Sequence, residues 1–139
     1  METLMDYINE LNWIAVLVAT MAGFIVSAIW YSVLFGKPWQ KAAGLKDKDV
    51  KNAGSKPLVL GFVTLFITAA AMGVLLPVLA LTTALQGASF GILAGLAFIA
   101  TNKAMTMTFE QRSPTLFWIN VGGDTITLAV IGAVLAVWR

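Results

Sequence analysis

Two charged residues, Lys103 and Asp124, lie inside stretches of this sequence that are otherwise apolar. A carboxylate that faces a lysine in such surroundings can bind and release a proton or a cation, or hold a polar ligand. Asn102 precedes the lysine, and Asn120 and Thr127 lie four residues before and three residues after Asp124. Residues three and four apart share one face of a helix. We therefore expect these five residues to form a buried polar layer, which is the candidate site for an ion, a proton or a ligand.

The same residues have a structural interpretation. Lys103 and Asp124 can form an ion pair whose only role is to fix the register of two helices. Alternatively, Lys103 can extend to the membrane interface and leave Asp124 protonated. The sequence supports the functional and the structural interpretation equally.

The composition excludes most other chemistry. The 139 residues include no cysteine and no histidine, which removes disulfides, thiol nucleophiles, histidine acid–base catalysis and the usual zinc or haem ligands. We predict no cofactor and no metal site, and a net charge of +2 is too small to predict a nucleic-acid partner. An enzyme that uses Asp124, Glu110 and Tyr31 is a weaker alternative, because the sequence places no nucleophile beside a base. We predict no catalytic residue.

The elements that must position the polar residues are membrane helices. Hydrophobic residues make up 59% of the chain and charged residues 12%, against about 25% charged in soluble domains. A helix needs about 20 predominantly apolar residues to cross a bilayer, and four stretches qualify. We predict an all-α integral membrane protein that forms one domain over residues 1–139, a compact bundle with spans at 13–35, 58–81, 88–109 and 116–138.

The N-terminus gives no sign of a cleaved signal peptide. Signal peptides begin with basic residues and have a short apolar core, whereas this chain begins with Glu2, Asp6 and Glu10 and a 23-residue span. We expect the first span to be retained.

The distribution of basic residues predicts the orientation. Eight of the nine lie in or beside the connection 36–57 and the turn near Arg112, and basic residues accumulate on the cytoplasmic side. We therefore expect a bacterial inner-membrane protein with both termini outside.

Six lysines lie in the connection: Lys37, Lys41, Lys46, Lys48, Lys51 and Lys56. They either bind anionic lipid or a partner, or serve only as a topology signal. Aromatic residues near the span ends are interpreted as interface anchors: Trp13, Trp30, Tyr31, Trp39, Trp118 and Trp138.

Small residues recur at helical spacing on the first three spans. They allow close helix contact in a membrane, so they predict a tight bundle, an oligomer, or both. The packing faces comprise Ala19, Gly23, Ser27, Gly73, Gly87, Gly91 and Gly95. Because the strong charge bias predicts a single orientation, an oligomer should be a parallel homo-oligomer.

Local signals complete the layout. Pro38 and Gly44 predict a short helix in the connection 36–57, and Ser113-Pro114 predicts the start of the fourth span. The third and fourth spans should form a tight hairpin, so that Lys103 lies level with about Gly122 and its side chain reaches Asp124.

Two groups of residues resemble the bacterial membrane-protein family catalogued as domain of unknown function 1761. The first runs through Asn12-Trp13, Gly23, Trp30-Tyr31-Ser32, Phe35-Gly36 and Trp39, and the second through Phe109-Glu110-Gln111-Arg112-Ser113, Phe117 and Asn120-Val121-Gly122. The resemblance covers essentially the whole chain and implies a small four-helix inner-membrane protein with no established activity. The chain departs from the family pattern at Val33, where members commonly have proline, and at Gly123-Asp124, where they often have an aromatic and a polar residue.

Two functional hypotheses follow. The first is a transport or channel-like bundle that moves a proton, cation or small polar molecule past Asp124. The second is a structural or accessory membrane protein whose polar layer only fixes helix packing.

Tyr31 and Ser32 near the end of the first span have two possible roles. They either contact the Glu110–Arg112 turn and so latch the first span to it, or they serve as interfacial residues.

Overall fold

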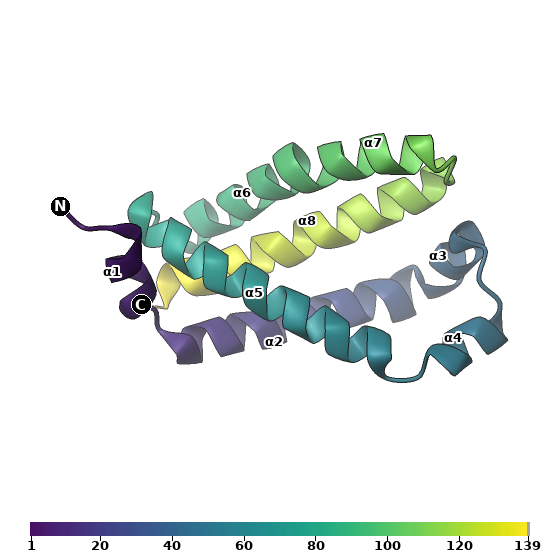
Figure 1. Cartoon of the computed structure of the whole chain (residues 1–139), viewed down its shortest axis with the longest axis horizontal. Coiled ribbons are helices and arrows are strands. Elements are labelled where there is room, and N and C mark those ends of the chain that lie inside the picture. Colours follow the sequence, from purple (N-terminus) through teal and green to yellow (C-terminus); the bar gives the residue numbers. More distant parts are fainter. Residues whose placement is uncertain (139) are drawn as a thin grey trace.

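The computed structural model describes residues 1–138, and these residues are helical with short connections (Figure 1). Four helical segments are long and apolar enough to span a membrane, which confirms the predicted all-helical class with four candidate spans. Their bounds fall within four residues of the predicted ones. They are Trp13–Leu34, Lys56–Val78, Ala84–Phe109 and Pro114–Val137.

Two of the four segments contain a π-helical turn. The first consists of α2, Trp13–Ile29, followed by the π-turn η1, Trp30–Leu34. The third consists of α6, Ala84–Ala94, the π-turn η2, Gly95–Ala100, and α7, Thr101–Phe109. The other two are continuous: α5, Lys56–Val78, and α8, Pro114–Val137. A π-turn rotates the following side chains relative to an α-helix, so the directions of side chains change within the first and third spans.

Short helices flank the spans. α1, Leu4–Asn9, precedes the first span, and Asp6 caps it by accepting a hydrogen bond from the Thr3 backbone N–H at 2.6 Å. The lysine-rich connection contains α3, Gly36–Ala43, and α4, Asp47–Ala53. Gly44 ends α3 in the left-handed conformation, with φ of 72°, as expected for a C-terminal glycine. The predicted short helix is therefore present and begins two residues earlier than Pro38.

The third and fourth spans form the predicted hairpin (Figure 1). Ser113 starts α8 by accepting a hydrogen bond from the Thr115 N–H at 3.2 Å. The glycines of α6 pack directly on the backbone of α8: a methyl group at Gly87 or Gly91 would collide with the carbonyl of Gly132 or Leu128. The predicted small-residue face of this span is thus a helix–helix contact inside one chain.

The core lies where α2, α5 and α8 pack together. Its fully buried side chains share 0% exposure and come from all three helices, namely Val16, Ala19, Thr20, Ala69, Leu76 and Ile131. Gly23 gives Ile131 its space, because a methyl group at Gly23 would lie 2.8 Å from that side chain. Gly73 likewise accommodates Leu11, at 2.7 Å.

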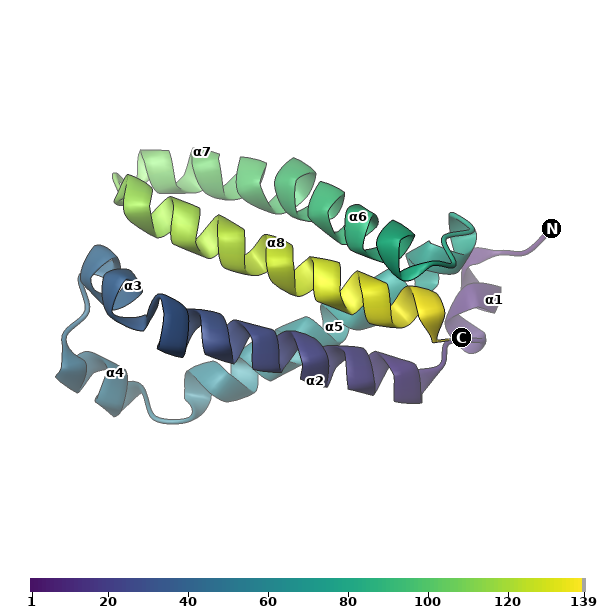
Figure 2. The same ribbon diagram turned by 180° about the vertical axis from the view of Figure 1, so that it is seen from behind.

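The distance between α5 and the helical hairpin changes along the spans. Both views place the C-terminal end of α5 near α6 and its N-terminal end away from α7 (Figures 1 and 2). α1 and the end of α8 lie at one end of the molecule, and α3, α4 and the turn between α7 and α8 lie at the other. The two basic connections therefore share one end, which is called the basic end below. The opposite end carries α1 with Glu2, Asp6 and Glu10 in and beside it, and is called the acidic end.

Candidate ion-pair site

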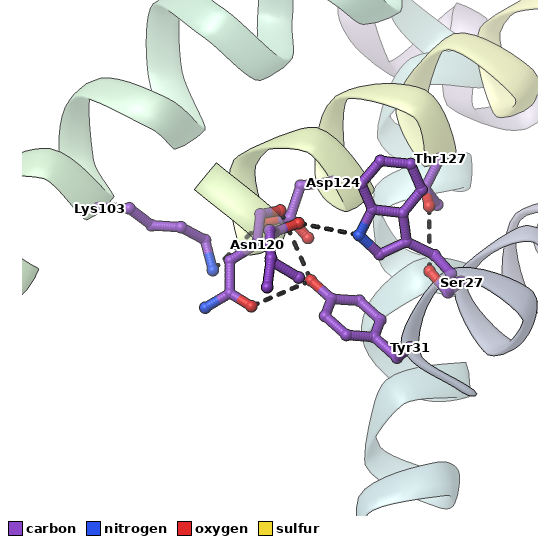
Figure 3. Close-up of polar contacts among 8 residues, drawn as sticks. Ser27, Tyr31, Lys103, Asn120, Asp124 and Thr127 are labelled. Atoms are coloured by element: carbon purple, nitrogen blue, oxygen red, sulfur yellow. Dashed lines mark hydrogen bonds and ion pairs between the residues drawn. The ribbon is translucent and has the colours of Figure 1, made fainter. Parts of the chain in front are cut away.

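Lys103 on α7 and Asp124 on α8 form an ion pair, with 3.2 Å between Lys103 Nζ and Asp124 Oδ2 (Figure 3). Their side chains remain 35% and 30% exposed, so the prediction that this pair is buried is wrong. The physical reason is that α5 diverges from α7 at this level and leaves the pair uncovered on one side. The Asp124 Oδ2 atom itself is inaccessible, so Lys103 covers the charged oxygen.

The neighbours of Asp124 on α8 face α2. Asn120 Oδ1 accepts a hydrogen bond from the Tyr31 hydroxyl at 3.2 Å, and Thr127 shares a hydrogen bond of 3.0 Å with Ser27 (Figure 3). Thr127 is buried. Asn102 is exposed, because consecutive residues of a helix point about 100° apart and Lys103 takes the direction toward α8. The structure thus brings four of the five predicted residues into one layer.

Trp30, which the sequence analysis interprets as an interface anchor, packs on α8. Its indole N–H donates to the Ile119 carbonyl at 2.9 Å, and its ring covers Gly122 and Gly123, where a methyl group would lie 2.8 Å from it. Sequence reasoning missed this contact, although the Gly122-Gly123 pair was the signal that a large side chain packs there. The other tryptophans at helix ends, Trp13, Trp118 and Trp138, are 53%, 69% and 42% exposed.

Of the two roles considered for Tyr31 and Ser32, the latch would require contact with the turn at Glu110–Arg112, whereas the contact of Tyr31 lies about two turns farther along α8. Tyr31 reaches Asn120, and Ser32 donates to the Ala28 carbonyl of its own helix. Both residues lie within the π-turn η1, in which the Phe35 N–H donates to the Trp30 carbonyl at 2.9 Å, five residues back.

Two open clefts adjoin the ion pair. The cleft between α5 and the hairpin has a volume of about 270 Å³, and its polar lining consists of Ser27, Thr64, Thr68, Lys103, Asp124 and Thr127. The cleft toward the basic end has a volume of about 260 Å³, and its polar lining includes Asn102, Lys103, Glu110, Arg112 and Asn120. Lys103 borders both clefts.

Comparison with known families agrees with the resemblance in the sequence. The model of the family described as "Protein of unknown function (DUF1761)" matches residues 14–136. The chain belongs to this family. No curated protein and no solved structure matches the chain. Its function must therefore be argued from the geometry of the site.

The site of this DUF1761 protein contains one carboxylate and one ammonium group. Among residues 1–138, no three histidine, cysteine or acidic side chains gather where a metal ion could bind. An ion pair beside open clefts can exchange partners: a cation can replace Lys103 at Asp124, or an anion can replace Asp124 at Lys103. The hydroxyl groups of Ser27, Thr64 and Thr68 border the same space and can hydrogen-bond to a polar guest.

Proposed function

We propose that this membrane protein is a small transporter in which the Lys103–Asp124 pair binds and releases a proton, a cation or a small polar molecule. The observation that carries the proposal is the ion pair at the border of two open clefts. A charge in the middle of a membrane helix costs about 2.5–3.5 kcal/mol on insertion scales. A pair that only fixed packing needs no open space beside it, whereas two clefts adjoin this pair.

The arrangement of the core favours a carrier over an open channel. Fully buried residues on three helices separate the cleft of Asp124 from the acidic end. They are Ala19 and Thr20 on α2, Ala69 on α5 and Ile131 on α8. A molecule in the cleft would need a conformational change to pass this core. The π-turns η1 and η2 adjoin the site, and such turns are frequent at functional sites.

We place the protein in the bacterial inner membrane with the basic end in the cytoplasm, as a parallel homo-oligomer. The exposed lysines on α3, α4 and the start of α5 support this orientation, because basic residues resist translocation. The same lysines can bind anionic lipid headgroups.

Flux through proteoliposomes tests the transport proposal. Asp124→Asn removes the charge with little change in size, and we expect it to lower the flux of protons or of one common cation at least tenfold. Asp49→Asn is the matched control, because Asp49 lies on α4 outside the spans, and its flux should equal that of the wild type. A wild-type flux equal to that of empty liposomes for protons and for common cations would refute the proposal, as would unchanged flux in Asp124→Asn.

A structural role is the second candidate, and a specific observation favours it. Trp30 and Tyr31 of η1 connect the first span to α8 beside the pair, so the pair completes a set of contacts that joins three spans. Lys103→Met and Asp124→Asn should each lower the thermal stability in detergent, because each leaves an unpaired charge. The double variant should recover most of the loss. Recovery of stability without any loss of flux would establish the structural role, whereas recovery of stability with loss of flux would support transport.

A further inference from the structure

A separate cavity of about 260 Å³ lies at the acidic end, between α1, α2, the end of α5 and the end of α8. Tyr7, Glu10 and Trp138 line it together with apolar residues that include Ala15 and Leu135. The fully buried core of α2, α5 and α8 separates it from Asp124. It is therefore a second site, whose ligand need not be the transported species.

The charge around this cavity favours a cation. The first ten residues contain Glu2, Asp6 and Glu10 and no lysine or arginine. Glu10 lines the cavity and its side chain is exposed, so its carboxylate is accessible to a cation that enters the space. The pKa of Tyr7 is raised, first by its hydrogen bond to Glu2 and also by the negative charges of Glu2, Glu10 and Asp6.

The end of α5 adds a backbone acceptor. Proline has no N–H, so Pro77 gives no hydrogen bond to the carbonyl oxygen of Gly73, four residues back. Both residues line the cavity. A carbonyl freed in this way in a membrane helix takes another donor, and a ligand with N–H groups can supply one.

The size of the cavity limits the ligand. Pockets for drug-sized molecules have volumes of about 300–1,000 Å³, so about 260 Å³ holds only a head group and a short apolar part. Aromatic rings attract cations through their faces, and Tyr7 and Trp138 both line the space.

We propose that this cavity binds a primary ammonium group carried by a short apolar chain. Glu10 is its counter-ion, the carbonyl of Gly73 is a second acceptor, and Tyr7 and Trp138 are its aromatic walls. A free amine and the ethanolamine headgroup of a phospholipid share this chemistry.

Isothermal titration calorimetry with benzylammonium tests the proposal on the full chain in phosphatidylcholine nanodiscs. Glu10→Gln keeps the shape of the side chain and should weaken binding at least tenfold, and Trp138→Leu should weaken it about three- to tenfold. The matched controls are Asp49→Asn and Trp118→Leu, at the basic end, which should bind as the wild type does. Benzyl alcohol, which lacks the charge, should bind at least tenfold more weakly than benzylammonium.

The source of the ammonium group is distinguished by adding phosphatidylethanolamine to the nanodiscs. A lower apparent affinity for benzylammonium in these discs identifies the lipid headgroup as the occupant, and an unchanged affinity identifies a free amine. The proposal is overturned if the wild type does not bind benzylammonium, if benzyl alcohol binds equally well, or if Glu10→Gln has no effect. None of these results depends on transport, because they measure binding without flux and compare variants of Glu10 and Trp138, which the fully buried core separates from Asp124.

Discussion

Trp30 and its two glycines show how single residues position the ion-pair site. The indole N–H donates to the Ile119 carbonyl, and the ring occupies the surface that Gly122 and Gly123 leave open. Asp124 follows directly on α8, so the contact that holds this turn of the helix also determines where the carboxylate lies.

Trp30→Ala should therefore destabilise the protein. We expect a loss of about 3 kcal/mol, as for other packed aromatic residues, because the hydrogen bond and the packing on α8 are lost together. Trp118→Ala is the control of the same residue type and should change the free energy of unfolding by less than about 0.5 kcal/mol, since its side chain is 69% exposed. Unfolding by denaturant in detergent measures both values. Equal losses in the two variants would contradict the packing role of Trp30.

Sequence reasoning located the charged residues of the site and missed the aromatic ones. The hairpin rule placed Lys103 near Gly122 because two helices joined by a tight turn keep their residues at matching depths. It could not predict the role of Trp30, since a tryptophan near the end of a span has the same sequence signature whether it faces lipid or another helix. The π-turn that begins at Trp30 is also not visible in a hydrophobic pattern with a period of 3.6 residues.

At the scale of the elements, glycine has opposite roles in α6 and α5. Gly91 lies against the backbone of α8, where a methyl group would meet the Leu128 carbonyl, whereas a methyl group at Gly61 would meet nothing within 4 Å. The hairpin therefore depends on the absence of a side chain at Gly91, and α5 gains nothing from its absence at Gly61.

The two glycines should consequently respond to the same substitution with opposite signs. Gly91→Ala should destabilise the protein by about 2 kcal/mol, because backbone atoms must move apart. Gly61→Ala should stabilise it by about 0.5–1 kcal/mol through helix propensity alone. Thermal unfolding of both variants in one detergent gives the comparison. A stabilising Gly91→Ala would show that α6 and α8 are not in close contact.

The helical class and the span limits were predictable because they depend on local apolar length, which the sequence displays directly. The divergence of α5 was not predictable, since it results from which faces of three helices meet. That divergence explains why Lys103 and Asp124 are partly exposed instead of buried.

At the scale of the whole molecule, all six lysines of the connection lie at the end that also carries the turn between α7 and α8. The positive-inside rule then predicts one orientation for every copy of the chain. Because the natural sequence has no cysteine, single cysteines report the orientation without interference.

Cysteine labelling in intact cells tests this orientation. Lys48→Cys on α4 should react with a membrane-impermeant thiol reagent only after permeabilisation, whereas Glu2→Cys should react in intact cells as well. Each variant keeps at least five of the six lysines, so the charge bias is maintained. Labelling of Lys48→Cys in intact cells would place the basic end outside and contradict the proposed orientation.

The divergence of α5 from α7 also determines how a guest reaches the ion pair. The cleft between α5 and the hairpin is lined by residues of all four candidate spans, so in a bilayer its open side would face acyl chains. Under the proposed transport function, a molecule dissolved in the lipid would enter this cleft from the side. For such a guest, occupancy of the cleft follows the concentration within the membrane, and compounds of equal charge should rank by their partition coefficients.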